Sequence, residues 1–100
     1  MDGFHIAKLD ETIHGRVRLG IMAFLSGAGG ADFNTLKIHL DTTDGNLSVH
    51  MRKLEDAGYV AIDKRIVGRK TLTTVKITRE GRAAFRDYLD AIAKLVEQKT

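Results

Sequence analysis

The chain contains no cysteine and no long apolar run. The lack of cysteine excludes disulfide bonds, thiolate catalysis and cysteine-type zinc sites, and it fits a reducing compartment. The longest mainly apolar run, Leu19–Leu25, is far too short to cross a bilayer. The first residues show no basic segment followed by an apolar core, so no secretory signal is expected. We therefore expect a cytoplasmic protein that has no membrane partner.

Residue groupings that support catalysis or metal binding are also missing from the sequence. No Ser-His-Asp set lies in a cleft-forming context, and no carboxylate pair is set in apolar surroundings. The four histidines do not fall into a metal-ligand spacing, and His14 with Asp10 or Glu11 supplies too few ligands. The glycine-rich stretch 26–30 lacks the spacing and the lysine of a phosphate-binding loop. We expect neither an enzyme nor a bound metal or cofactor.

What the sequence does contain is typical of one small globular domain with a local excess of positive charge. The 100 residues are 43% hydrophobic and 29% charged, which predicts a single domain over residues 1–100. The net charge is +3, but residues 59–82 alone hold seven basic and two acidic side chains. A local basic patch favours a polyanionic partner. The alternative is a solvated, charged hairpin that binds nothing.

Hydrophobic periodicity predicts three helices in the first 57 residues. The first helix is expected at 9–25, with Arg16 and Arg18 pointing outward, and the stretch 26–30 should end it. Its apolar surface is wide enough for the core or for contact with a second subunit. A short helix at 33–40 follows, capped by Asp32. The third helix is expected at 43–57, where Leu47, Met51 and Leu54 share one face and Gly58 ends the helix.

The period then changes from helical to alternating. Alternation over 59–78, interrupted at Val67–Lys70, predicts a β-hairpin with a basic tip. Such a hairpin must pack on the helices to be stable. Helical spacing returns over 79–98, where Thr78 can cap the last helix. The expected fold is mainly α with a small β-hairpin, an α+β class, and the last helix has an apolar stripe that needs a partner.

The outward face of the 43–57 helix suits the DNA major groove. Asn can pair bidentately with adenine, Ser can bond several bases, Val can touch a thymine methyl, and Arg or Lys can reach guanine or phosphate. His50 either contacts DNA or holds the turn by a hydrogen bond. Asp44, whose carboxylate would repel phosphate, should accept from a cytosine amino group or cap its own helix. The alternative is that part of this face only fills surface.

Three stretches resemble the winged helix-turn-helix regulators of the MarR, ArsR and PadR-like families. GNLSVHMRKLEDAGYV is similar to their recognition-helix segment. KITREGRAAF is similar to the segment that joins the wing to the last helix, and HGRVRLGIMAFL is similar to their first helix. The resemblance implies a three-helix core, a wing at 59–78 and a C-terminal dimerisation helix. It also implies a homodimeric transcriptional regulator, usually a repressor, which binds double-stranded DNA.

The resemblance assigns residues to two surfaces. The DNA-binding set comprises Thr43, Asp44, Asn46, Ser48, Val49, His50, Arg52, Lys53, Arg65, Arg69 and Lys70. The dimerisation set comprises Leu19, Met22, Phe85, Tyr88, Leu89, Ile92, Leu95 and Val96. A groove between the first and last helices of the dimer could hold an apolar small-molecule effector of unknown identity. The alternative function is a winged-helix module that binds another protein through its last helix and binds no DNA.

Overall fold

The computed structural model describes residues 6–97 of the chain. The helical elements are η1 (Ile6–Lys8), α1 (Arg16–Ala28), α2 (Phe33–Leu40), α3 (Asp44–Asp56) and α4 (Arg79–Glu97); the strands are β1 (Gly30–Asp32), β2 (Val60–Val67) and β3 (Lys70–Ile77). The predicted α+β class, with three helices before a hairpin and one after it, is confirmed. The predicted helical residue Gln98 lies outside the described residues.

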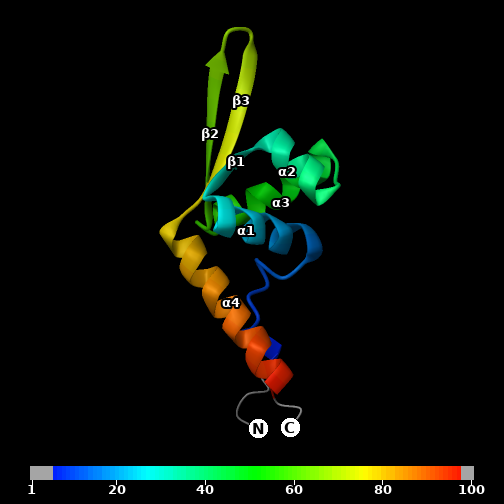
Figure 1. The fold of residues 1–100 in the computed structure, drawn as a ribbon, viewed down its shortest axis with the longest axis vertical. Coiled ribbons are helices and arrows are strands. Elements are labelled where there is room, and N and C mark those ends of the chain that lie inside the picture. The colour runs from blue at the N-terminus through cyan, green and yellow to red at the C-terminus, as the bar shows by residue number, and fades with distance from the viewer. Residues whose placement is uncertain (1–5, 98–100) are drawn as a thin grey trace.

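The elements form a long molecule with two projecting ends (Figure 1). The β2–β3 hairpin extends from one end, α4 leads away at the other, and α1, α2 and α3 lie between them. The longest dimension is 57 Å, against 25 and 21 Å in the other two directions. No helix within residues 6–97 combines the length and the apolarity that crossing a membrane requires. The hairpin and α4 are therefore the two elements that project from the helical body.

The sheet has a third strand that the sequence analysis did not predict. Its order is β1-β3-β2 and all pairings are antiparallel, with Ala31 opposite Val75. β1 is only three residues long, so it shows no alternation that a sequence pattern could reveal. A Cβ at Gly30 would lie 3.2 Å from the carbonyl oxygen of Val75, so glycine suits this close pairing. β1 fixes the base of the hairpin to the helical body.

The first helix differs from its predicted range of 9–25 at both ends. Asp10 Oδ1 accepts from the backbone N–H of Thr12 at 2.8 Å, and Gly15 has a φ of 145°, so residues 9–15 form turns. At the other end α1 continues through Ser26 and Gly27 and stops before Gly29, whose φ is 84°. The stretch 26–30 therefore does not end the helix where we expected, since only its last two residues leave the helical path.

One core joins the helices to the sheet. Its buried side chains come from α1, α2, α3, both long strands, the first half of α4 and the loop before α1. They are Ile13, Val17, Ile21, Met22, Leu25, Leu36, Leu47, Met51, Leu54, Val60, Val75, Phe85 and Tyr88. Gly20 lets α1 approach α2, because a Cβ there would lie 2.6 Å from Leu40 Cδ2. The core therefore holds α3 and the base of the hairpin in a fixed relation.

Three residues assigned to the dimer surface are part of this core. Met22, Phe85 and Tyr88 are buried within the single chain, because α1 and the first half of α4 pack on each other. Leu89 and Val96 remain 49% and 60% exposed on α4. The other members, Leu19, Ile92 and Leu95, are half-buried. The apolar surface left for a partner is therefore on the second half of α4.

Candidate nucleic-acid interface

Helix α3 has one buried side and three other strips: one lies opposite the core, one faces the hairpin and one faces α1. Leu47, Met51 and Leu54 anchor it in the core. The strip opposite the core is exposed and carries Val49, which is 55% exposed, together with Gly45. Space around Gly45 is open, since a Cβ there would meet nothing within 4 Å. This strip is therefore open to solvent along Gly45 and Val49.

A groove of about 400 Å³ separates the hairpin-facing strip of α3 from the hairpin. It is lined by Phe33, Ser48, Met51, Arg52, Glu55, Ile62, Lys64 and Thr73. Lys64 was not assigned to the interface by sequence. Its position could have been found, because side chains two apart on a strand share a face and Ile62 points inward. Lys64 and Arg52 place positive charge on opposite walls of the groove.

The strip of α3 that faces α1 holds side chains already engaged within the chain. Asn46 Nδ2 donates to Thr42 Oγ1 at 2.8 Å. His50 Nδ1 lies 2.8 Å from an Nη1 donor of Arg18. Arg18 therefore turns toward α3 and does not point outward as expected. Burial lowers the pKa of His50, and the positive charges of Arg18 and Lys53 lower it further.

The N-terminus of α3 is built from two residues that the resemblance assigned to DNA binding. Thr43 is the cap: its Oγ1 accepts from the backbone N–H of Asn46 at 3.2 Å. Asp44 neither caps α3 nor remains unpaired, because its carboxylate forms an ion pair with Lys37 Nζ at 2.8 Å. The repulsion expected between this carboxylate and phosphate is reduced accordingly, and the pair ties α2 to α3.

The tip of the hairpin is a tight two-residue turn. Val67 pairs with Lys70, and Gly68 between them has a φ of 65°, while Arg69 has no positive φ. This arrangement is a type II′ turn, in which glycine is favoured at the first central position. Arg69 and Lys70 are both exposed, and the nearby Ile66 is 80% exposed. The tip is thus cationic and partly apolar.

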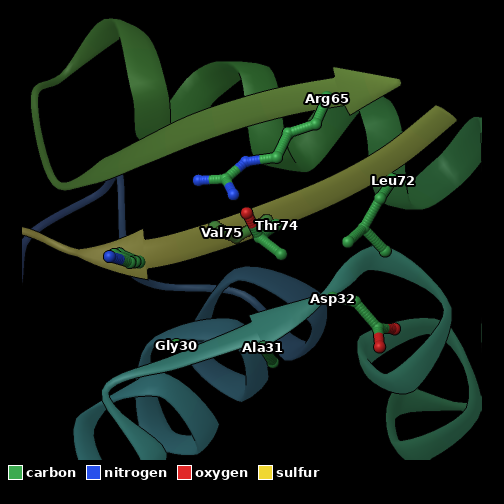
Figure 2. A pocket seen from close by; sticks show the side chains of 8 residues that line it. Gly30, Ala31, Asp32, Arg65, Leu72, Thr74 and Val75 are labelled. Carbon is green, nitrogen blue, oxygen red and sulfur yellow. The ribbon is translucent and has the colours of Figure 1, made fainter. Parts of the chain in front are cut away.

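Arg65 lies on the opposite face of the hairpin from α3. Figure 2 shows its side chain reaching from β2 toward Thr74 on β3, where it lines a pocket of about 380 Å³. The pocket is lined by β1 and β3 residues and contains no residue of α3. Arg65 Nε also donates to Asp63 Oδ2 at 3.1 Å. Of the three wing cations named from sequence, Arg69 and Lys70 lie at the tip and Arg65 lies away from the groove.

Comparison with known proteins identifies the family. A model described as a winged helix DNA-binding domain matches residues 17–96. The chain belongs to the winged helix DNA-binding domain family. An uncharacterised protein of Methanocaldococcus jannaschii is 43% identical over 79 residues, which are 79% of this chain and 86% of that protein.

Solved structures of winged helix proteins agree with the assignment. The transcriptional regulator homologue protein from Pyrococcus horikoshii OT3 is 31% identical, with a TM-score of 0.86 over 98% of this chain and 97% of that one. A MarR family transcriptional regulator from Silicibacter pomeroyi shares the fold at 22% identity, with a TM-score of 0.63 over 92% of this chain and 64% of that one. The predicted resemblance to winged helix regulators is confirmed. Family and fold are those of a DNA-binding transcriptional regulator, not of an enzyme.

Within residues 6–97, histidine, aspartate and glutamate side chains do not gather in threes as a metal-binding group. Polar side chains lie on α3, in the groove and at the wing tip. These surfaces offer hydrogen-bond donors and positive charge.

Proposed function

We propose that this winged helix protein is a homodimeric transcriptional repressor that binds double-stranded DNA sequence-specifically in the cytoplasm. The observation that carries the proposal is the exposed side of α3 lying beside a cationic hairpin, both anchored to one core. In this arrangement the exposed strip of α3 enters the major groove. Asn46, Ser48 and Val49 then lie closest to base edges.

The groove between α3 and the hairpin supports a path for one DNA backbone strand. Arg52 and Lys64 stand on its two walls, and Thr73 adds a hydroxyl donor. Cations and hydroxyls are the usual side-chain partners of phosphate oxygens. The wing tip would then reach the adjacent minor groove or backbone with Arg69 and Lys70. Glu55 is the one carboxylate in the groove, and it favours phosphate placement toward Lys64.

A homodimer would form through the second half of α4. Leu89 and Val96 leave apolar surface on a helix that extends away from the body (Figure 1). Pairing two such helices buries that surface, and it places two copies of α3 on one duplex. The same dimer would enclose a groove between α1 and α4, which is where we propose that an apolar effector binds.

Two variants separate the two kinds of contact. Arg69→Ala should weaken binding to every sequence alike and lower the slope of log K against log salt by about 1. Asn46→Ala should change the preference at one or two base pairs and leave the slope unchanged. Affinities measured by fluorescence anisotropy on a panel of duplexes at several salt concentrations distinguish these outcomes.

Arg86→Ala is the matched control, because it removes the same charge from the exposed side of α4. If Arg69→Ala behaves as Arg86→Ala does, the wing makes no phosphate contact. If Asn46→Ala loses the same affinity on all duplexes, Asn46 does not read a base.

A further inference from the structure

Arg18 is the most fully engaged cation among the described residues. Its Nε donates to the carbonyl oxygen of Thr12 at 2.6 Å, and an Nη2 donor lies 3.5 Å from the carbonyl oxygen of Glu11. Its Nη1 lies 2.8 Å from His50 Nδ1. One guanidinium thus joins the loop before α1 to the helix that faces DNA. None of these contacts was evident from the sequence.

The loop before α1, whose carbonyl groups Arg18 bonds, makes two further side-chain contacts with the rest of the chain. Asp10 Oδ2 accepts from the hydroxyl of Tyr59 at 2.5 Å, and His14 Nδ1 lies 2.7 Å from the hydroxyl of Tyr88. The first contact ties the loop to the start of β2, and the second ties it to α4. Arg18 is therefore held on a rigid support, so it can orient a partner precisely enough to matter for recognition.

This geometry selects the protonation pattern of the His50 ring. A guanidinium has only donors, so His50 Nδ1 must accept the hydrogen bond. A neutral imidazole that accepts at Nδ1 carries its proton on Nε2. Nε2 is the ring nitrogen that does not contact Arg18, and it forms no hydrogen bond with any residue between 6 and 97. His50 is half-buried and lies one helical turn after Asn46 on the same strip of α3.

We propose that Arg18 is a positioning residue that holds His50 as a hydrogen-bond donor toward DNA. This inference rests on the proposed function. His50 Nε2–H then donates a hydrogen bond to an acceptor on DNA. The acceptor is either a base atom, for example N7 or O6 of guanine or O4 of thymine, or a phosphate oxygen. If the acceptor is a base atom, this donor discriminates against the amino groups of adenine and cytosine, which are themselves donors. In either case Arg18 contributes to DNA binding through His50 without touching the duplex.

The first test is spectroscopic and needs no DNA. Long-range ¹H–¹⁵N correlation spectra of the whole protein at neutral pH should show His50 with its proton on Nε2. In Arg18→Met, which keeps an unbranched apolar side chain but removes the guanidinium donors, the ring should become a mixture of both tautomers. Arg16→Met is the control, since Arg16 is exposed on the same helix. A wild-type ring protonated on Nδ1 would overturn the proposal.

The second test is a double-mutant cycle on DNA affinity. Arg18→Met should cost about tenfold in affinity for the preferred duplex, as expected for one hydrogen bond, and Arg16→Met should cost less. In a His50→Ala background, Arg18→Met should have almost no further effect. If it still costs tenfold there, Arg18 acts through something other than His50 and the proposal fails.

The same variants identify the acceptor and separate this proposal from the proposed function. His50→Ala changes the preference at one base pair if the acceptor is a base atom, and it weakens all duplexes alike if the acceptor is a phosphate. Either result supports a donor role. If the wild-type protein binds no duplex, the proposed function itself fails and the role of His50 fails with it. If it binds and Arg18→Met matches Arg16→Met, only the inference about Arg18 fails.

Discussion

Tyr59 and Asp10 form a single contact that places the loop before α1 against the sheet. The Tyr59 hydroxyl donates to Asp10 Oδ2, and Asp10 Oδ1 also accepts from the backbone N–H of Thr12. Both oxygens of this carboxylate are therefore used. Because Arg18 bonds the carbonyl groups of the same loop, the Tyr59–Asp10 contact also supports the surroundings of His50.

The Tyr59–Asp10 contact predicts unusual behaviour at alkaline pH. The hydrogen bond to Asp10 raises the pKa of Tyr59 to about 12, with smaller contributions from burial and from the charges of Asp10 and Asp87. The folded-state pKa lies above the unfolded value of about 10. The stabilisation of the folded state by this hydrogen bond is therefore complete below pH 10 and is lost as pH rises through 12. Asp10→Asn should move the ionisation of Tyr59 back toward pH 10 in a phenolate absorbance titration.

Glu11→Gln is the control for that titration, because it removes a neighbouring exposed charge and leaves the hydrogen bond intact. Tyr88 serves as an internal reference, since burial raises its pKa as well. A wild-type titration in which Tyr59 ionises near pH 10 would contradict the contact.

At the scale of residues, the sequence predicted features that depend on local spacing. It did not predict contacts between side chains that lie far apart in the chain. The cap at Asp32 and the basic tip at Arg69 follow from local patterns, and the structure places both as described. The Arg18–His50 and Lys37–Asp44 contacts join different helices, so their formation depends on how α1 and α2 pack on α3. A single sequence carries no signal for such packing.

At the scale of elements, the errors have local physical causes. The prediction that a helix begins at Leu9 followed apolar spacing, but the Asp10 side chain bonds the backbone and Gly15 adopts a conformation that interrupts the helix. The short strand β1 exists only because β3 lies beside it. Helix α4 begins where Thr78 Oγ1 accepts from the backbone N–H of Gly81 at 2.9 Å, and a sequence-level cap signal was sufficient there.

The junction between the hairpin and α4 gives a prediction about stability. A Cβ at Gly81 would overlap the carbonyl oxygen of Tyr59 and would lie 3.0 Å from Ile77 Cγ1. Because the obstacle is backbone, Gly81→Ala should lower the free energy of unfolding by about 1–3 kcal/mol. Urea denaturation followed by circular dichroism measures this change.

Gly27→Ala is the matched control for the junction. Gly27 also lies in a helix, but a Cβ there meets nothing within 4 Å. The substitution should therefore stabilise the protein, by up to about 1 kcal/mol. Equal stability of Gly81→Ala and the wild type would show that the two elements do not pack as closely as described.

At the scale of the whole molecule, the two surfaces that we propose for DNA and for a second copy lie far apart. The cationic hairpin projects at one end and the apolar second half of α4 at the other, along a molecule 57 Å long (Figure 1). Residues 59–82 hold seven of the sixteen lysine and arginine residues, so the charge is concentrated toward the hairpin. In the proposed dimer, this separation would let one chain bind a duplex and pair with a second copy at the same time.

The most direct measurement is selection of binding sites from a random duplex pool, followed by affinity titrations at several salt concentrations. A dimer with two copies of α3 on one duplex predicts enrichment of an inverted repeat, with half-sites spaced by one helical turn of ~10 base pairs or a multiple of it. The logarithm of the binding constant for that site should fall linearly with the logarithm of the salt concentration, because phosphate contacts release counterions. A pool without any enriched sequence, together with no duplex binding even at low salt, would contradict the account.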